Sequence, residues 1–253
     1  MGGESGAPGE REARAVWLGR RGYEPVHALQ QRLLRARAAG QVGDVVLLVE
    51  HDPVITLGKN AKREHVLATA AAPTGGVPVV RTGRGGDVTY HGPGQLVGYP
   101  ILDLKPARCD VRKYVGCLAR AMIGLAGKHG VAAGEGGRYV GVWADRAHPE
   151  RWSGMDEAET PVKIGAIGVR LSNWVTMHGF ALNLTTDLDA YQLIVPCGIR
   201  EYGVSSVGAL TGTGPPVADV ALQSAPVLAA SLGLPLERVE DESTAPDLAG
   251  VLR

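Results

Sequence analysis

Two residues of this sequence, a cysteine and a lysine, have the chemistry for covalent catalysis and stand in unusual surroundings. Cys197 ends an apolar run and is flanked by Pro196 and Gly198, which put its thiol on a rigid turn where side chains become reachable. A cysteine after an apolar run is more often buried and inert. A nucleophile also needs a positive neighbour or a base, because a free thiol has a pKa of about 8.5. Cys197 is therefore a candidate nucleophile, with a packing role as the plainer interpretation.

Lys163 is the candidate partner of that thiol. It is one of only six lysines, and it stands in the segment 162–169, which is otherwise apolar or glycine. A charged residue at the start of a strand normally faces water, but glycines at 165 and 168 mark the close approach of a ligand or another backbone. An ammonium in such a groove could hold a thiolate or shuttle a proton. Because 34 residues separate Lys163 from Cys197, their proximity does not follow from the sequence.

Two histidines and a glycine-rich stretch are weaker candidates. His91 and His178 each precede a glycine, and a lone histidine is more often structural than catalytic. Neither has metal-ligand spacing with another histidine or cysteine, so we expect no metal site. The stretch 81–95 around His91 has six glycine or proline residues, which favour close backbone approach to a ligand. It lacks the GxxxxGK[ST] and GxGxxG arrangements, so it fits neither a P-loop nor a dinucleotide fingerprint.

Composition excludes several classes of protein. Lys+Arg and Asp+Glu are equal at 26 each, so bulk charge predicts neither a nucleic-acid nor a membrane partner. Three cysteines without a CxxC pair indicate no disulfide framework and favour a reducing cytoplasm. The amino-terminal residues have no apolar signal region, and no run of about 18 apolar residues occurs. We therefore expect a cytoplasmic protein of one domain, with 253 residues and 45% hydrophobic content to form its core.

Hydrophobic periodicity predicts more strands than helices, partly in consecutive runs. Strands are expected at residues 16–18, 45–49, 54–57, 77–81, 87–90, 95–102, 139–144, 162–170 and 175–184. Helices are expected from Pro25 to about Gly40, from Val111 to about Lys128 after an Asp110 cap, and over 217–233. We expect a disordered tail at 1–13, an exposed loop at 145–160 and a loose tail at 237–253. This order predicts an α+β fold with a mixed, largely antiparallel sheet.

Four ordered motifs together resemble one family, the lipoyl(octanoyl) transferases. They are GRGGDVTYHGPGQ at 83–95, KIGAIGVR at 163–170, HGFALN at 178–183 and VPCGI at 195–199, and HDPVITLGK at 51–59 is similar too. The resemblance covers about residues 16 to 232. It implies the single-domain fold of biotin and lipoate ligases, the class II aminoacyl-tRNA synthetase/biotin ligase type, with a catalytic domain at 14–236.

The resemblance also implies roles for individual residues. Cys197 would accept the acyl group, and Lys163 would be the acid/base partner that lowers the pKa of its thiol. The implied substrate-binding residues are Arg84, Gly85, Gly86, Asp87, Val88, Thr89, Tyr90, His91, Ala166, Ile167, Gly168, Gly179, Phe180 and Ala181. No metal or cofactor is implied.

The implied reaction moves an octanoyl group from octanoyl-acyl carrier protein to a lysine, the first step of endogenous protein lipoylation. The implied acceptors are the lipoyl domains of 2-oxoacid dehydrogenase E2 subunits and the glycine cleavage H protein, and the enzyme is expected to be monomeric. Two alternatives stay open. One is an ATP-dependent lipoate or biotin ligase on the same fold, and the other is a non-enzymatic binding module in which Cys197 is merely buried.

Overall fold

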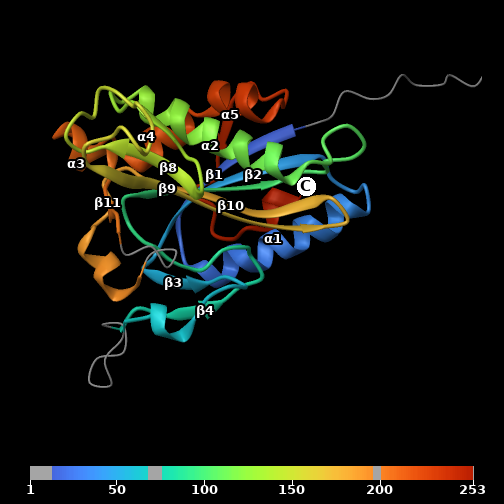
Figure 1. The fold of residues 1–253 in the computed structure, drawn as a ribbon. Coiled ribbons are helices and arrows are strands. Elements are labelled where there is room, and N and C mark those ends of the chain that lie inside the picture. The colour runs from blue at the N-terminus through green and yellow to red at the C-terminus, as the bar shows by residue number, and fades with distance from the viewer. Residues whose placement is uncertain (1–12, 68–75, 196–200, 253) are drawn as a thin grey trace, which may run out of the picture.

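A large mixed sheet forms the centre of the protein, with helices on both of its faces (Figure 1). The computed structural model describes residues 13–67, 76–195 and 201–252. In spatial order the strands of the large sheet are β12 (Val239–Asp241), β1 (Ala13–Arg21), β2 (Asp44–His51), β6 (Gln95–Ile101), β10 (Val175–Asn183), β9 (Pro161–Ser172), β8 (Tyr139–Asp145) and β7 (Ala133–Gly136), and β11 (Gly203–Val204) also pairs with β9. A smaller sheet has the order β4 (Val79–Arg81), β3 (Val54–Leu57) and β5 (Val88–His91).

Strand directions confirm the predicted α+β class. The pairs from β2 through β6, β10, β9 and β8 to β7 are all antiparallel, whereas β1 is parallel to both β2 and β12. The bounds of the α-helices are α1 (Tyr23–Ala38), α2 (Val111–Gly127), α3 (Val207–Thr211), α4 (Val217–Leu222) and α5 (Ala225–Leu232). Among the described α-helices, only α1 connects two successive parallel strands, β1 and β2, whereas a doubly wound fold repeats this unit throughout.

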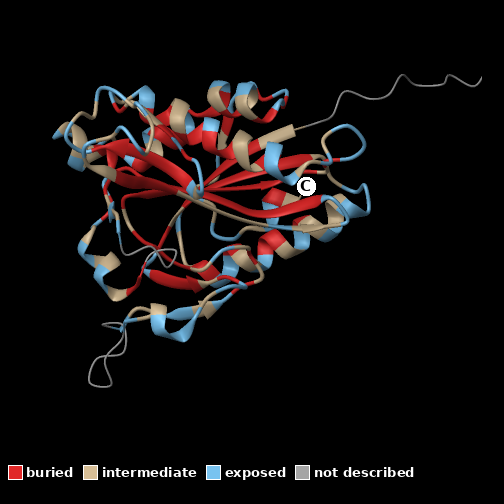
Figure 2. Cartoon of the chain, in the orientation of Figure 1, coloured by how far each residue is buried: buried red, intermediate tan, exposed pale blue. Residues whose placement is uncertain are grey.

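The alternation of side chains along the central strands explains the two helical layers. In β2, Val46 and Leu48 join the hydrophobic cluster under α2, α4 and α5, while Leu47 joins the cluster under α1. Because successive strand residues point to opposite faces, a strand with apolar residues at every position must be covered on both sides. Figure 2 shows the result, with buried strands between helices whose outer faces are exposed.

The predicted ends of the long helices rest on local chemistry. In α2 the Asp110 carboxylate accepts a hydrogen bond of 3.0 Å from the Lys113 backbone N–H, which satisfies one of the free donors at the helix start. The helix expected over 217–233 is instead two helices, α4 and α5. Pro226 stands at the second position of α5 and has no N–H to continue a helix from α4, so the chain breaks at Ser224 and starts again.

The carboxyl-terminal segment differs from the loose tail expected for 237–253. Val239–Asp241 forms β12 and pairs in parallel with β1 from Ala15 to Trp17. Val251, in the short turn of helix at Ala249–Leu252, is buried in the α1 cluster. Polar composition hid these contacts, because a short edge strand needs only a few apolar residues. The tail predicted at the amino terminus lies outside the described residues apart from Ala13, which begins β1.

The loop at 145–160 has neither helix nor strand beyond Asp145, as expected. It is nonetheless fixed at its base. The buried Asp145 carboxylate accepts backbone hydrogen bonds from Ala147, Glu159 and Thr160 at 2.8 to 3.0 Å. Trp152 packs on Gly134, where a Cβ would lie 2.1 Å from the indole nitrogen. The loop therefore covers the end of β7 and β8.

Close contact between β6 and β10 depends on a glycine. A Cβ at Gly179 would lie 2.2 Å from the Gly98 carbonyl oxygen, which cannot move without breaking the sheet. We expect Gly179→Ala to lower the free energy of unfolding by about 2 kcal/mol or more, measured by urea denaturation. The matched control is Gly127→Ala at the end of α2, where nothing lies within 4 Å of a new Cβ and the change is expected to be neutral or slightly stabilising. Equal stability of the two variants would contradict this contact.

Candidate active site

Lys163 lies inside the protein rather than facing water. Its side chain projects from β9, is 6% exposed, and donates a hydrogen bond of 2.8 Å from Nζ to the Val140 carbonyl oxygen. The ammonium also lies 5.6 Å from the centre of the Trp143 ring, a favourable cation–π position. Gly141 makes the room, because a Cβ there would lie 2.5 Å from the Lys163 Cε atom. The sequence analysis predicted neither Gly141 nor Val140 as part of the site. A glycine inside a strand indicates close approach of another group, and this signal could have identified Gly141.

The chain returns to Lys163 directly after the segment that contains Cys197. Val204 of β11 pairs with Lys163 of β9, and the Ser205 N–H donates to the Lys163 carbonyl oxygen at 2.9 Å. On the other side of the segment, the Val195 N–H donates to the His65 carbonyl oxygen at 2.8 Å. Cys197 itself lies outside the described residues.

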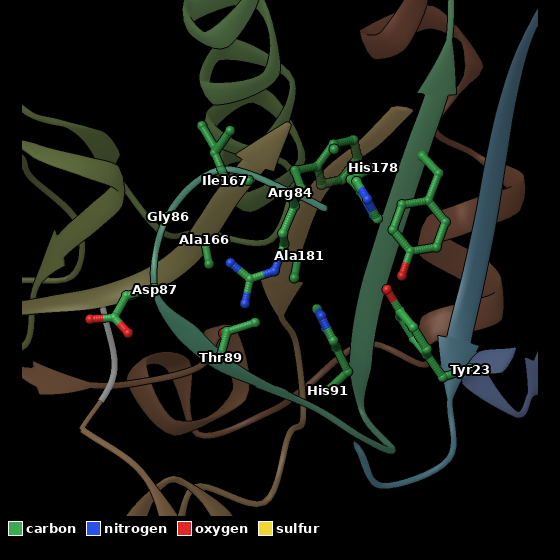
Figure 3. Close-up of a pocket in the computed structure, with 14 residues that line it drawn as sticks. Tyr23, Arg84, Gly86, Asp87, Thr89, His91, Ala166, Ile167, His178 and Ala181 are labelled. Carbon is green, nitrogen blue, oxygen red and sulfur yellow. The ribbon is translucent and has the colours of Figure 1, made fainter. Parts of the chain in front are cut away.

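A slot runs beside Lys163 between the glycine-rich stretch and the strands β9 and β10. We call it the β9–β10 slot, and its lining residues are Tyr23, Arg84, Gly86, Asp87, Thr89, His91, Tyr99, Ala166, Ile167, Gly168, His178, Gly179, Phe180 and Ala181 (Figure 3). A small hollow that contains Lys163 adjoins it and shares three of these residues, Thr89, Ala166 and Ala181. Three of the predicted motifs therefore meet at one place, although the stretch at 83–95 is far in the sequence from those at 163–170 and 178–183.

Most of the predicted substrate-binding residues line this slot, but three do not. Val88 is fully buried in the core of the small sheet. Tyr90 stacks edge-on against Tyr191 at a ring distance of 5.7 Å. The Gly85 N–H is used in a 2.8 Å hydrogen bond to the Val169 carbonyl oxygen, which ties the stretch to β9. These three residues therefore support the wall of the slot without lining it.

Two lining residues, Tyr23 and Tyr99, were missed from the sequence. Tyr23 begins α1, and Tyr99 lies in β6. Neither belongs to a glycine-rich or charged motif, so nothing local marked them. The His51 ring accepts from the Tyr99 hydroxyl at 2.9 Å while its Nδ1–H donates to the Arg21 carbonyl at 3.0 Å, which gives the motif at 51–59 a role in supporting the slot.

Arg84 occupies the middle of the slot, between Ala166 and His178 in the view of Figure 3. It is buried, and its guanidinium donates to the Thr56 carbonyl and hydroxyl oxygens at 2.7 and 3.1 Å and to the Gly85 carbonyl at 3.1 Å. Its stem packs on Gly168, where a Cβ would lie 3.0 Å from the Arg84 Cδ atom. The slot has a volume of only about 40 Å³ in this arrangement, room for a few water molecules.

The imidazoles around the slot are held neutral by burial. Burial lowers the pKa of His91 to about 3, that of His178 to about 3 and that of His51 to about 4. His91 donates from Nδ1 to the Gln95 side-chain oxygen at 2.7 Å. Burial also raises the pKa of Tyr23 to about 12. At neutral pH the charged residues of the lining are therefore Arg84 and Asp87.

Side chains from separate motifs hold the slot together. The Gln95 amide donates to the Asn183 side-chain oxygen at 2.9 Å, and the Asn183 amide donates to the Ser205 carbonyl at 3.0 Å. The Asp87 carboxylate pairs with the His65 ring at 2.5 Å, and the backbone of His65 holds Val195. These bonds connect the stretch at 83–95 with both sides of the segment that contains Cys197.

Two absences apply to the described part of the chain. Over residues 13–67, 76–195 and 201–252, no group of three His, Cys, Asp or Glu side chains is placed to hold a metal ion. Within the same ranges, the helices are too short or too polar to cross a membrane.

The two described cysteines are free, with Cys109 exposed and Cys117 partly buried in α2, where its sulfur accepts from Arg120 at 3.1 Å. Cys117 packs against the hydrophobic cluster under α2, α4 and α5.

Solved structures of low sequence identity share this fold. The bipartite lipoate protein ligase of Thermoplasma acidophilum has a TM-score of 0.64 at 15% identity, covering 92% of this chain and 88% of the other. A lipoate-protein ligase A bound with ATP has a TM-score of 0.62 at 16% identity, covering 91% and 89%. These similarities confirm the lipoate ligase fold predicted from the motifs.

Sequence comparison is more specific. Residues 23–227 match the lipoyl protein ligase A/B catalytic domain family. An octanoyltransferase of Myxococcus xanthus is 48% identical over 204 residues, which are 80% of this chain and 55% of that protein. An octanoyltransferase of Chloroflexus aggregans is 44% identical over 206 residues, 81% of this chain and 87% of that protein. The chain therefore belongs to the lipoyl protein ligase A/B catalytic domain family, and within it to the octanoyltransferases.

Proposed function

We propose that this protein transfers an octanoyl group from octanoyl-acyl carrier protein to a specific lysine of lipoyl domains, through a thioester on Cys197. The observation that carries the proposal is the buried ammonium of Lys163 at the end of the slot, next to the strand by which the chain returns from Cys197. Membership of the octanoyltransferases supports the same reaction. The chain spans 55% of the length of the Myxococcus relative, so this activity is proposed for the domain at 14–236.

The first half of the reaction forms the acyl-enzyme. The Cys197 thiolate attacks the carbonyl carbon of the donor thioester, and backbone N–H groups hold the oxyanion that develops. When the oxyanion collapses, the bond from carbon to the carrier sulfur breaks. The Lys163 ammonium, in the role of general acid, gives a proton to that leaving thiolate. Ala166 and Gly168 of the slot and Gly165 of the adjoining hollow are small, which leaves room for an alkyl chain beside this centre.

The second half transfers the group to the acceptor. The amine of the acceptor lysine attacks the Cys197 thioester carbon, Lys163 takes a proton from that amine, and the bond from carbon to the Cys197 sulfur breaks. An amide replaces a thioester, which is downhill, so ATP is not consumed. Passage of one group through one covalent intermediate predicts ping-pong kinetics.

The β9–β10 slot is the proposed acyl site. The residues assigned to substrate binding are those predicted from the motifs that line it, at 84, 86, 87, 89, 91, 166–168 and 179–181. Each buried methylene of the chain contributes about 0.8 kcal/mol. Because the present volume is about 40 Å³, the slot has to widen to admit an alkyl chain.

Partner docking is assigned to a basic surface next to the slot. Lys59, Lys62 and Arg63 are exposed, and the Lys59 backbone N–H donates to the Arg84 carbonyl at 2.9 Å. Such a patch suits an acidic carrier protein. The acceptors in this proposal are lipoyl domains of 2-oxoacid dehydrogenase E2 subunits and the glycine cleavage H protein, with the enzyme acting as a cytoplasmic monomer.

An ATP-dependent lipoate ligase is the second candidate, since lipoate ligases share the fold. In such an enzyme Lys163 would hold a phosphate oxygen, and Cys197 would have no required role. The names of the relatives favour the transferase.

We expect Cys197→Ala to abolish octanoyl transfer, because it removes the atom that carries the acyl group. Intact mass spectrometry after mixing with octanoyl-acyl carrier protein should show an octanoyl adduct on the wild type and none on the variant. Cys117→Ala, in α2, is the matched control and should keep the adduct. An undiminished adduct on Cys197→Ala would overturn the assignment of the nucleophile.

Lys163→Arg keeps the positive charge but holds its proton too tightly to act as a base. We expect turnover to fall by roughly a hundredfold or more, the usual contribution of a general acid or base. The control is Lys113→Arg on the exposed side of α2. Substantial turnover by Lys163→Arg, measured with a lipoyl domain as acceptor, would show that the residue acts only as a charge beside the thiolate.

A further inference from the structure

His178 stands at the end of the β9–β10 slot away from Lys163, and its backbone is strained. It has a φ of +59° in the middle of β10, although a histidine side chain disfavours the left-handed region. Its backbone N–H donates to the Gln30 side-chain oxygen at 3.1 Å, while the residue stays in register with Val169 of β9. Strain of this kind persists only where the surrounding structure imposes it, and it is concentrated at functional sites.

The His178 imidazole, which this backbone conformation positions, forms a buried polar wall at the end of the β9–β10 slot. His178 is 2% exposed, and within the described residues its Nε2 atom has no hydrogen-bond partner. Behind it the ring stacks on His27 of α1, with ring centres 5.7 Å apart and planes inclined by 19°. Burial keeps the pKa of His178 near 3, so the wall is uncharged at neutral pH. A backbone strain and an unpartnered polar atom at one residue are two separate costs that packing alone does not explain.

The register of β9 and β10 places this wall at a definite depth. Ala181, which pairs with Ala166, lies where the slot meets the hollow of Lys163, and His178 lies three residues further along β10. Three strand residues span about 10 Å. An extended eight-carbon chain, with C–C bonds of about 1.5 Å, is about 9 Å long. A chain whose carbonyl lies beside Lys163 would therefore reach the His178 ring with its terminal methyl group.

We propose that His178 closes the acyl slot and sets the longest acyl chain that the enzyme accepts. This inference rests on the proposed octanoyl transfer. A longer chain would press its extra methylenes against an imidazole edge that needs a hydrogen-bond partner and against His27 behind it. Those methylenes would gain none of the burial that favours the first eight carbons.

The left-handed backbone offers a sharp test, because glycine adopts that conformation without strain. His178→Gly removes the ring and leaves the backbone relaxed, so the slot lengthens toward His27. We expect the variant to raise the rate of transfer from dodecanoyl-acyl carrier protein relative to octanoyl-acyl carrier protein by roughly tenfold or more over the wild-type ratio. Rates are measured with one lipoyl domain as acceptor. His178→Asn, which also tolerates a positive φ and has a shorter side chain, should shift the ratio in the same direction by less.

Asn173→Gly is the matched control. Asn173 also has a positive φ, +48°, but it lies exposed in the turn between β9 and β10 and does not line the slot. This variant should keep the wild-type ratio. A folded His178→Gly or His178→Asn enzyme with an unchanged ratio would overturn the inference, and so would a wild type that transfers the two chains equally fast. Absence of octanoyl transfer by the wild type would instead overturn the proposed function.

Discussion

Close contact between backbones, at positions without side chains, is the constraint on which the site depends. A Cβ at Gly58 would lie 2.3 Å from the Gly86 carbonyl oxygen, and one at Gly168 would lie 3.1 Å from that of Gly85. The backbone of the glycine-rich stretch can therefore pack closely between the end of β3 and β9. With a side chain at either place the stretch would be pushed away, and the wall of the slot would be lost. Gly58 and Gly168, which lie outside the glycine-rich stretch, thus let that stretch approach its neighbours closely.

Burial then sets the electrostatics of the site. Neutral imidazoles and tyrosines surround the slot, and two cations lie within it or at its end, Arg84 and Lys163. Each cation is placed by backbone carbonyls, those of Thr56 and Val140. Low polarity strengthens the interaction of an ammonium with a thiolate and with a developing oxyanion. The arrangement therefore suits chemistry on a neutral thioester with an apolar chain.

Much of this organisation could be predicted from the sequence, and the exceptions have physical reasons. Apolar runs identified the central strands because both faces of the sheet are covered, and Asp110 marked the start of α2. Pairing of β12 with β1 is a contact between the two ends of the chain, which no local pattern encodes. Tyr23 contributes to the site only because the fold brings it to the slot, and Gly141 only because the fold brings it to Lys163. The family motifs marked the slot and included His178, whereas the role proposed for His178 rests on its backbone conformation, which no local pattern indicated.

Single-turnover transfer from octanoyl-acyl carrier protein to a lipoyl domain, with ATP absent, tests most directly whether this site moves an acyl group from a thioester. Octanoyl-lysine should form on the lipoyl domain without ATP, and free octanoate with ATP should give none. Octanoyl-lysine formed only from free octanoate and ATP would show that the same fold and the same lysine serve a ligase, and would contradict the transferase assignment.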